Sequence, residues 1–235
     1  MSDVARATLT IDVGGTGIKS MVLDEAGEPI SERVRVRTPR PATPEAVVAA
    51  IMAVIKPQPA FERVSVGFPG VVVDNVVHTA PNLDGEWAQF PLGRELEVAT
   101  ERMVRIANDA DVQGLGVIEG EGVEMVLTLG TGMGSALFVD GHLVPNLELG
   151  HHPLTKKRTY EEYIGKAALK AIGDKAWNKR VRRVLAQIQP IWNPRLIHVG
   201  GGNAKKLKGN LPDNVCIVPN VAGLLGGIRL WRDVP

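Results

Sequence analysis

A short apolar segment that runs directly into a glycine turn constrains this chain more than any other feature. Residues 8–13 are β-branched and apolar, as in a buried strand, and Gly14, Gly15 and Gly17 follow at once. Residues 18–23 are apolar again, so the order is strand, glycine turn, strand. A P-loop or a dinucleotide-binding turn needs a helix after its glycines, so the pattern argues against both of those folds.

The turn has the composition of a phosphate-binding loop. Glycines allow backbone N–H groups to approach phosphate oxygens, and Thr16 and Lys19 add a hydroxyl and a positive charge. Asp12, at the end of the first strand, stands where a Mg²⁺ ion bound to those phosphates needs a carboxylate. We therefore expect Asp12 to bind Mg²⁺, and phosphate to be bound by Gly14, Gly15, Thr16 and Lys19. The alternative, on this stretch alone, is an ordinary glycine-rich hairpin with a surface aspartate.

The same pattern occurs a second time in the middle of the chain. Residues 125–129 form an apolar strand, residues 130–134 a glycine-rich turn, and residues 135–139 another strand. Two such hairpins facing each other would hold a phosphate chain from both sides. The phosphate contacts expected from the second hairpin come from Thr128, Gly130, Thr131 and Gly132.

Three motifs in this order resemble those of the ROK family of sugar kinases, which belongs to the actin-like ATPase superfamily. They are the two hairpins and, between them, Asn108-Asp109-Ala110. The resemblance extends over nearly the whole chain. It implies an α/β protein with the two-lobed actin-like (ribonuclease H-like) fold and a sugar cleft between the lobes. We expect the N-terminal lobe at residues 1–107 and the C-terminal lobe at residues 108–235, with the last helix (221–232) returning to the N-terminal lobe.

The resemblance assigns Asp109 as the catalytic base. Phosphoryl transfer to an alcohol needs a carboxylate within hydrogen-bond reach of the hydroxyl, to orient it and to accept its proton. The alternative role of Asn108 and Asp109 is to cap the following helix, and both roles are compatible, because a cap places the base at the head of a rigid element. The family's sugar-binding residues correspond here to Asn82, Asn108, Asp109, Glu148, His151 and Glu161.

Two of these sugar contacts have structural alternatives. Asn82 stands in a polar loop, where an asparagine commonly bonds to its own backbone. Glu161 is followed by Glu162, which would also fit the family's motif. A third glycine turn then matches the family's nucleotide-side motif. We expect its phosphate or nucleotide contacts from Gly200, Gly201, Gly202, Lys205 and Lys206.

Many ROK proteins bind zinc through a cysteine cluster close to the sugar-binding histidine. The single cysteine of this chain, Cys216, stands in an apolar run far from His151, and His152 is the only other candidate ligand nearby. A structural zinc site needs about four ligands, so we expect no zinc. One cysteine also rules out an intrachain disulfide and fits a reducing cytoplasm.

Charge is distributed unevenly along the chain, although the net charge is only +1. Residues 151–210 contain 14 Lys and Arg against 3 Asp and Glu, whereas residues 1–150 contain 11 against 21. Such a segment indicates a polyanionic partner, and solvated helix faces are the alternative. Together with the short chain and the missing zinc cysteines, it resembles the polyphosphate-dependent glucokinases of the family. The residues expected to bind the tail of a polyphosphate chain are Lys179, Arg183, Lys205, Lys206 and Lys208.

The predicted reaction is Mg²⁺-dependent phosphoryl transfer from polyphosphate, or from ATP, to the 6-hydroxyl of glucose. A strictly ATP-dependent glucokinase or mannokinase is the first alternative. A sugar-sensing regulator is the non-enzyme alternative, but such regulators carry an N-terminal helix-turn-helix, whereas here the first strand begins by Thr8. A polyphosphate hydrolase would have no sugar to hold.

Location and partners follow from the absence of targeting signals and from the family. No apolar run approaches the ~20 residues of a membrane helix, and the N-terminus has no signal-peptide core. We therefore expect a cytoplasmic enzyme with no membrane or nucleic-acid partner. The resemblance implies a homodimer.

Overall fold

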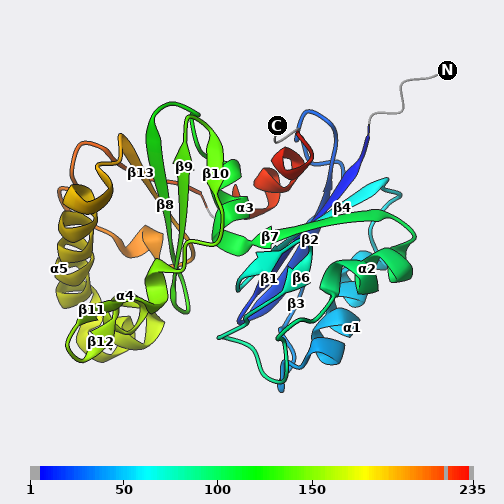
Figure 1. The fold of residues 1–235 in the computed structure, drawn as a ribbon, viewed down its shortest axis with the longest axis horizontal. Helices are drawn as coiled ribbons and strands as arrows, with labels where there is room; N and C mark the ends of the chain where they lie inside the picture. Colours follow the sequence, from blue (N-terminus) through cyan, green and yellow to red (C-terminus); the bar gives the residue numbers. More distant parts are fainter. Residues whose placement is uncertain (1–5, 220–221, 233–235) are drawn as a thin grey trace. The chain divides into compact units, whose positions relative to one another are not determined.

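The computed structural model describes residues 6–219 and 222–232, which form two compact units. Of these residues, 6–116 and 223–232 belong to unit 1, and 117–219 and 222 belong to unit 2 (Figure 1). α3 (Asp109–Leu115) belongs to unit 1, whose first segment extends to residue 116, whereas the expected lobe boundary lies after residue 107. Among the described residues, no helix is long and apolar enough to cross a membrane.

Unit 1 is built on a five-stranded sheet of order β3-β2-β1-β4-β7. Its first three strands are antiparallel and its last three are parallel, so β1 has one neighbour of each kind. The strands are β1 (Thr8–Gly14), β2 (Gly17–Leu23), β3 (Val34–Val36), β4 (Arg63–Phe68) and β7 (Met103–Asn108). The expected hairpin is confirmed. The alternation of Val34 and Val36 with arginines also predicts a strand at residues 28–37, but this strand is wrong in length, because only β3 pairs and residue 29 makes one isolated bridge to Leu23.

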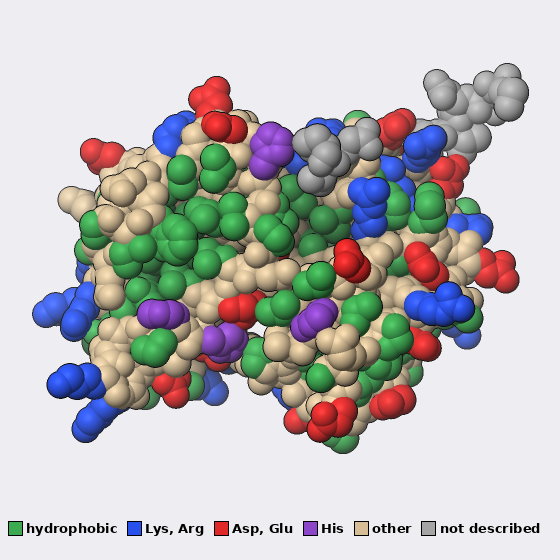
Figure 2. Space-filling model, in the orientation of Figure 1, with side chains coloured by type: hydrophobic (Ala, Val, Ile, Leu, Met, Phe, Trp, Pro, Cys, Tyr) green, Lys and Arg blue, Asp and Glu red, His purple; other side chains and the backbone are tan. Residues whose placement is uncertain are grey.

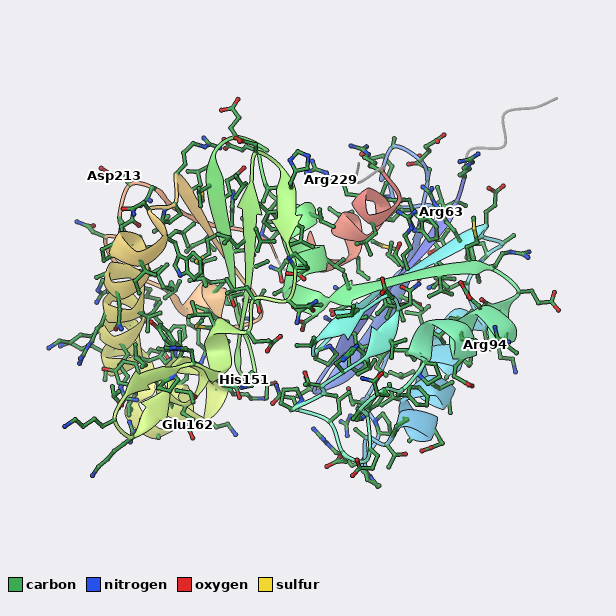
Figure 3. The ribbon with its side chains drawn as sticks, viewed as in Figure 1. Arg63, Arg94, His151, Glu162, Asp213 and Arg229 are labelled. Atoms are coloured by element: carbon green, nitrogen blue, oxygen red, sulfur yellow. The ribbon has the colours of Figure 1, made fainter. Side chains whose placement is uncertain are left out.

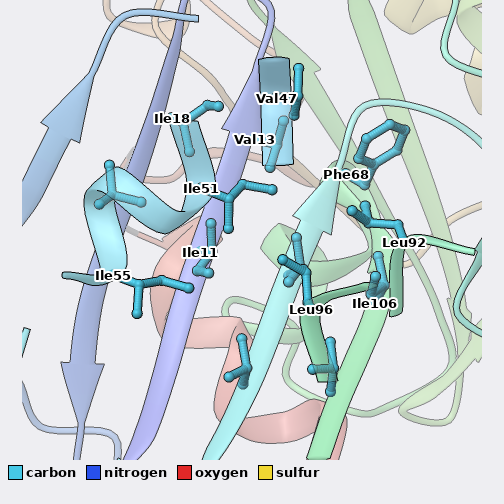
Figure 4. Packing of buried hydrophobic residues seen from close by; sticks show 14 of the residues in the cluster. Ile11, Val13, Ile18, Val47, Ile51, Ile55, Phe68, Leu92, Leu96 and Ile106 are labelled. Carbon is cyan, nitrogen blue, oxygen red and sulfur yellow. The ribbon is translucent and has the colours of Figure 1, made fainter. Parts of the chain in front are cut away.

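Two helices cover one face of this sheet. α1 (Pro44–Ile55) begins at the N-cap Thr43, as the sequence predicts, and α2 (Leu92–Thr100) ends at Glu101. Alternate residues of the strands point into this layer, where Ile11 lies beside Ile51 of α1 and Phe68 beside Leu92 of α2 (Figure 4). Between β4 and α2, a small hairpin forms from β5 (Val72–Val73) and β6 (Val76–Val77).

The opposite face carries α3 and the C-terminal segment. The helix expected at residues 221–232 is only partly confirmed, because α6 (Ala222–Leu225) gives way to the 3₁₀ turn η3 (Gly226–Trp231), and residue 221 lies outside the described residues. Gly226 lies so close to α3 that a Cβ would be 1.7 Å from the carbonyl oxygen of Val112. Trp231 Nε1 donates a hydrogen bond of 2.7 Å to Ser65 Oγ, which itself donates to the carbonyl of Gly227. These two hydrogen bonds therefore attach the C-terminal segment to β4.

Unit 2 repeats the topology of unit 1 with a sheet of order β10-β9-β8-β13-β14. Here too the first three strands are antiparallel and the last three parallel. The strands are β8 (Val123–Leu129), β9 (Met133–Val139), β10 (His142–Val144), β13 (Leu196–Gly200) and β14 (Val215–Ile217). Two copies of one mixed sheet, each opened by a glycine-turned hairpin, are the α/β architecture expected from the sequence.

Helical residues 160–192 cover unit 2. The sequence predicts helices at residues 161–171 and 174–189, and Gly173, with a non-helical φ of 73° and ψ of 165°, divides α5 (Lys166–Trp192) between these two predicted ranges. A further break, which the sequence does not predict, separates α4 (Tyr160–Ile164) from α5. Trp177 and Val181 of α5 pack on Leu127 of the sheet. The remaining elements are η1 (Leu149–His151), β11 (Pro153–Thr155), β12 (Arg158–Thr159) and η2 (Ala204–Lys206).

Candidate active site

The first hairpin places its two charged residues side by side. Asp12 in β1 and Lys19 in β2 are cross-strand partners, and Lys19 Nζ lies 2.5 Å from Asp12 Oδ2. Both side chains are about one-fifth exposed (21% and 20%), so the pair is accessible at the surface of the hairpin. The lysine thus neutralises the carboxylate expected to bind Mg²⁺, and both groups are within reach of one ligand.

The glycine turn itself is held from one side by residues that the sequence analysis did not single out. Thr38 Oγ1 donates a hydrogen bond to the carbonyl of Gly14, and Arg40 Nη2 donates one of 2.8 Å to the carbonyl of Gly15. In a trans peptide the C=O and the following N–H point in opposite directions. The N–H groups of Gly15 and Thr16 therefore point away from Thr38 and Arg40, as a phosphate-binding turn requires.

Asp12 and Asp109 share one edge of the unit 1 sheet. Asp12 is paired in register with Gly67 of β4, and Gly67 with Ala107 of β7, two residues before Asp109. Neighbouring strands lie about 4.8 Å apart, so Asp12 and Ala107 are separated by about 10 Å across the sheet. A Cβ on Gly67 would be 3.4 Å from the Cα of Asp109. The glycine thus allows the start of α3 to lie close to β4, at the carboxyl ends of the parallel strands, where α/β proteins bind ligands.

Asn108 caps α3, as the alternative interpretation proposed. Its side-chain oxygen accepts a hydrogen bond of 2.8 Å from the N–H of Ala110, and its amide donates one of 3.1 Å to the carbonyl of Gly70. Asn108 is 6% exposed, so these bonds fix it firmly. Asp109 follows as the first residue of the helix and is partly exposed. The cap therefore holds the predicted base on a rigid element.

Asn82, the remaining sugar residue of unit 1, lies in a loop attached to the start of α1. The carboxylate of Asp84 accepts a hydrogen bond of 2.7 Å from the N–H of Ala42, and Trp87 Nε1 donates to the carbonyl of Asp84 at 3.0 Å. Asn82 itself is partly buried.

In unit 2, three predicted sugar residues gather beside the second hairpin. Glu148 Oε2 lies 3.3 Å from His151 Nε2. A Cβ on Gly132 would be 1.8 Å from Glu161 Oε2, so this carboxylate rests against the turn. Burial raises the pKa of Glu148, and Glu161 raises it further, although His151 acts in the opposite direction. Figure 3 shows His151 beside α4, near the turn that joins β8 and β9.

Glu161 and Glu162 make different contacts, which favour Glu161 as the predicted sugar ligand. Glu162 forms a capping box with Thr159 at the start of α4, accepting from its N–H at 2.8 Å and donating its own N–H to Thr159 Oγ1 at 3.2 Å. Glu161 instead lies against Gly132. Glu162 is thus occupied in capping the helix, whereas the carboxylate of Glu161 lies beside the second glycine turn.

The third glycine turn, residues 200–202, is bonded to the second hairpin. Gly201 has φ of 85°, and a Cβ there would be 2.6 Å from the backbone of Leu129. The backbone N–H of Asn203 donates to the carbonyl of Leu129 at 2.9 Å, and its side chain donates to that of Gly130 at 2.9 Å. Asn203 was not singled out from the sequence, although its position directly after three glycines was a signal. Unit 2 therefore brings both of its glycine turns together.

Basic residues extend from this third turn onto α5. The buried Asn178 of α5 donates to the carbonyl of Lys206 at 2.9 Å and accepts from the N–H of Lys208 at 2.7 Å. Arg182 donates to the carbonyl of Lys208 at 3.0 Å. Lys206 has a weak acidic partner, Asp174, at 3.5 Å. The lysines following the turn thus lie beside the part of α5 that carries Asp174, Asn178 and Arg182, and Figure 2 shows Lys and Arg side chains projecting from the α5 side of unit 2.

Comparisons with known proteins identify the family of this chain. A sequence profile of the ROK family matches residues 8–167. The polyphosphate glucokinase of Mycobacterium tuberculosis (strain CDC 1551 / Oshkosh) is 37% identical over 92% of this chain and 88% of its own length. The crystal structure of an inorganic polyphosphate/ATP-glucomannokinase from Arthrobacter sp. strain KM superposes with a TM-score of 0.87 at 35% identity, covering 95% of this chain and 97% of the other.

A more distant structure supports the fold alone. The ROK family glucokinase from Streptomyces griseus, in complex with glucose and AMPPNP, is 23% identical, with a TM-score of 0.76 over 95% of this chain and 98% of its own. The repeated mixed sheets and the glycine-turned hairpins define an α/β protein of the actin-like ATPase class. Within that class, the chain belongs to the ROK family.

Proposed function

We propose that this chain is a glucokinase that transfers a phosphoryl group from inorganic polyphosphate, and also from ATP, to the 6-hydroxyl of glucose. The observation that carries the proposal is the similarity, over nearly the full chain, to a protein named polyphosphate glucokinase and to a polyphosphate/ATP-glucomannokinase. The second of these names supports mannose as a further acceptor. The residues of the site fit the reaction, as the following steps show.

Asp109 orients the 6-hydroxyl and accepts its proton as the oxygen attacks phosphorus. A new bond forms between that oxygen and the phosphorus, and the bond to the donor oxygen breaks. The leaving group is a polyphosphate shorter by one phosphate, or ADP. Asn82 and Asn108 in unit 1, and Glu148, His151 and Glu161 in unit 2, are the proposed hydrogen-bonding partners of the sugar hydroxyls.

The two hairpins are the proposed binding sites of the transferred and leaving phosphates. The N–H groups of Gly15 and Thr16, directed away from Thr38 and Arg40, would donate to phosphate oxygens together with Lys19. Thr131 and the glycines on either side of it would do the same in unit 2. Such donors stabilise the negative charge that develops in the transition state.

The residues of unit 1 fit a Mg²⁺ ion. No three His, Cys, Asp or Glu side chains among the described residues lie close enough together to hold a metal, but Mg²⁺ in kinases needs only one or two carboxylates beside the phosphates. Asp12 would hold it, and Lys19, which in this structure is paired with Asp12, would then bind phosphate instead. When bound, the ion would neutralise charge on the phosphoryl group.

The basic residues of unit 2 support polyphosphate as the phosphoryl donor. Polyphosphate carries about one charge per phosphate, so lysines beyond the glycine turn can bind its tail by displacing counterions. The proposed path of the tail starts at Asn203, which contacts the second hairpin, and passes Lys205, Lys206 and Lys208, a segment bonded to α5 through Asn178. Lys179 and Arg183 of α5 are the proposed contacts beyond it. ATP has no such tail and would depend on these residues less.

Replacing Lys205, Lys206 and Lys208 together with alanine tests the choice of donor. We expect kcat/KM for long-chain polyphosphate to fall by about tenfold or more at low salt, and its dependence on salt concentration to become shallower by up to about two in logarithmic slope. Activity with ATP should change by less than about threefold, because ATP has no polyphosphate tail that could contact these lysines. Initial rates of glucose 6-phosphate formation over a salt series measure both effects.

A matched control removes three charges elsewhere in the same unit. Lys156, Lys157 and Arg158 are exposed at the β11–β12 hairpin, and their triple alanine variant should retain the polyphosphate activity. Equal losses in both triple variants would mean that only overall charge matters. Turnover with ATP but not with polyphosphate in the unmodified enzyme would contradict the proposed donor.

Two further parts of the proposal concern assembly and location. We propose a homodimer in the cytoplasm, supported by the family and by a single cysteine that can form no intrachain disulfide. Light scattering after size-exclusion chromatography measures the mass in solution. A mass of one chain would contradict the dimer.

A further inference from the structure

Arg40 contacts two loops that the proposed function assigns to different substrates. Its Nη2 donates to the carbonyl of Gly15 at 2.8 Å, and its Nη1 lies 3.3 Å from Asp84 Oδ2. Gly15 belongs to the hairpin proposed to bind the donor. Asp84 belongs to the loop that carries Asn82, proposed to bind the sugar. One guanidinium therefore bridges the donor hairpin and the sugar loop within unit 1.

On the donor side, Arg40 fixes the orientation of one peptide group. Because the carbonyl of Gly15 points to the guanidinium, the N–H of Thr16 must point the other way. Glycine backbones rotate easily, so a turn of this composition needs an external contact to keep one orientation. Thr38 does the same for the neighbouring peptide.

On the sugar side, Asp84 is a firm anchor. Its carboxylate accepts from the N–H of Ala42 at 2.7 Å, and its own N–H donates to the carbonyl of Ala42 at 3.1 Å. The bond from Ala42 lowers the pKa of Asp84, and Arg40 lowers it further, so the group is charged at neutral pH. Trp87 Nε1 closes the loop on the carbonyl of Asp84. A displacement of this loop would therefore move Asp84 and, with it, Arg40.

We propose that Arg40 is a positioning residue that couples the two substrates, so that hexose bound at the Asn82 loop strengthens donor binding at the first hairpin. This inference rests on the proposed kinase function. Sugar that orders the loop would hold Asp84 in place, Asp84 would hold the guanidinium, and the guanidinium would keep the Thr16 N–H directed at phosphate. A rate-competent donor site would then form mainly when an acceptor is present, which limits transfer to water.

If Arg40 only stabilised the fold, removing its side chain would lower the thermal midpoint and leave the coupling unchanged. The side chains of Arg40 and Asp84 are 59% and 51% exposed, and exposed ion pairs contribute little to stability. Arg40→Ala should therefore leave the thermal midpoint within about 2 °C of that of the unmodified protein. The expected effect is on coupling instead.

The experiment measures KM for polyphosphate at glucose concentrations well below and well above the KM for glucose. We expect saturating glucose to lower the KM of the unmodified enzyme by about fivefold or more, the lower range of typical couplings. In Arg40→Ala, the ratio of the KM for polyphosphate at low glucose to the KM at saturating glucose should fall to about one. Asp84→Asn should lose the ratio as well, and the double variant should lose no more than either single variant, since both act through one contact.

Two further variants separate coupling from charge. Arg33 is exposed in the same segment, and Arg33→Ala should keep the full ratio. Arg40→Lys keeps the charge but lacks the planar fork that reaches two partners, so it should lose most of the ratio.

The outcomes distinguish this inference from the proposed function. No glucose-dependent turnover in the unmodified enzyme would overturn the function itself. Turnover with a ratio of one in the unmodified enzyme, or an unchanged ratio in Arg40→Ala, would overturn only the coupling. A KM raised equally at both glucose concentrations in Arg40→Ala, and rescued by lysine, would show direct phosphate binding by Arg40 and would likewise overturn the coupling.

Discussion

Replacing Asp109 with asparagine should lower kcat by about 10²- to 10⁴-fold, the usual contribution of a general base, while the fold and glucose binding are retained. Asparagine has the same shape and still begins α3, but it cannot accept the proton of the sugar hydroxyl. The loss of a carboxylate in the first turn of a helix costs only about 0.3–1 kcal/mol of stability. Steady-state kinetics and calorimetric titration of glucose measure the two quantities separately.

The control for this variant is Asp74→Asn. Asp74 is exposed in the turn between β5 and β6 and has φ of 50°, a conformation that asparagine also adopts. It should leave kcat unchanged. Near-normal turnover of Asp109→Asn would contradict the assignment of the base, and loss of glucose binding with kcat unchanged would make Asp109 a sugar ligand only.

The second large effect is expected in stability, at Glu124. This carboxylate is fully buried at the start of β8, and it accepts hydrogen bonds from three successive backbone N–H groups in the segment that enters unit 2. It also lies 2.8 Å from His198 Nε2. Glu124→Ala leaves these donors without an acceptor, and each such group costs about 1–3 kcal/mol. We expect unfolding in urea to show a loss of about 3 kcal/mol or more.

A neighbouring glutamate provides the contrast. Glu119 pairs with Arg195 at 2.8 Å on the surface, and its side chain is 58% exposed. Because exposed pairs contribute little, Glu119→Ala should cost no more than about 1 kcal/mol. Equal losses for the two variants would contradict the account of Glu124.

The contribution of Glu124 should also depend on pH. Burial alone would raise its pKa, but the hydrogen bonds from Glu119, Gly120, Glu121 and His198 outweigh burial, so the pKa is lowered. A carboxyl group with a lowered pKa stabilises the fold above its unfolded value of about 4.3, and this stabilisation is lost as the pH falls through the folded value. The difference in stability between the unmodified protein and Glu124→Ala should therefore narrow below pH 4. A constant difference from pH 7 to pH 3.5 would contradict this.

Local signals explain what the sequence could predict. The hairpins at Gly14 and Gly130 are strands of apolar, β-branched residues interrupted by glycine, a pattern written within a few neighbouring residues. Two other predictions rest on equally local signals. Thr43 followed by Pro44 predicts the start of α1, and Asp74-Asn75 predicts the turn between β5 and β6. The order of the motifs then identified the family, and with it the candidate residues of both units.

The remainder depends on contacts between distant residues. The break before α5 arises because Gly165 lies against the backbone of Thr131 and Gly132, which no helical periodicity reveals. Arg40 and Asp84 are 44 positions apart, and each reads as an ordinary loop residue. Glu124 looks like the polar residue of an alternating strand, yet it is buried among backbone donors supplied by the preceding segment.

The most direct test of the proposed function is to identify the product. Purified protein is incubated with glucose, Mg²⁺ and long-chain polyphosphate, and phosphorus NMR follows both glucose 6-phosphate and inorganic phosphate. We predict glucose 6-phosphate that accumulates only when glucose is present, with little inorganic phosphate, and the same product at a different rate when ATP replaces polyphosphate. Release of inorganic phosphate without glucose, or no reaction with either donor, would contradict the account.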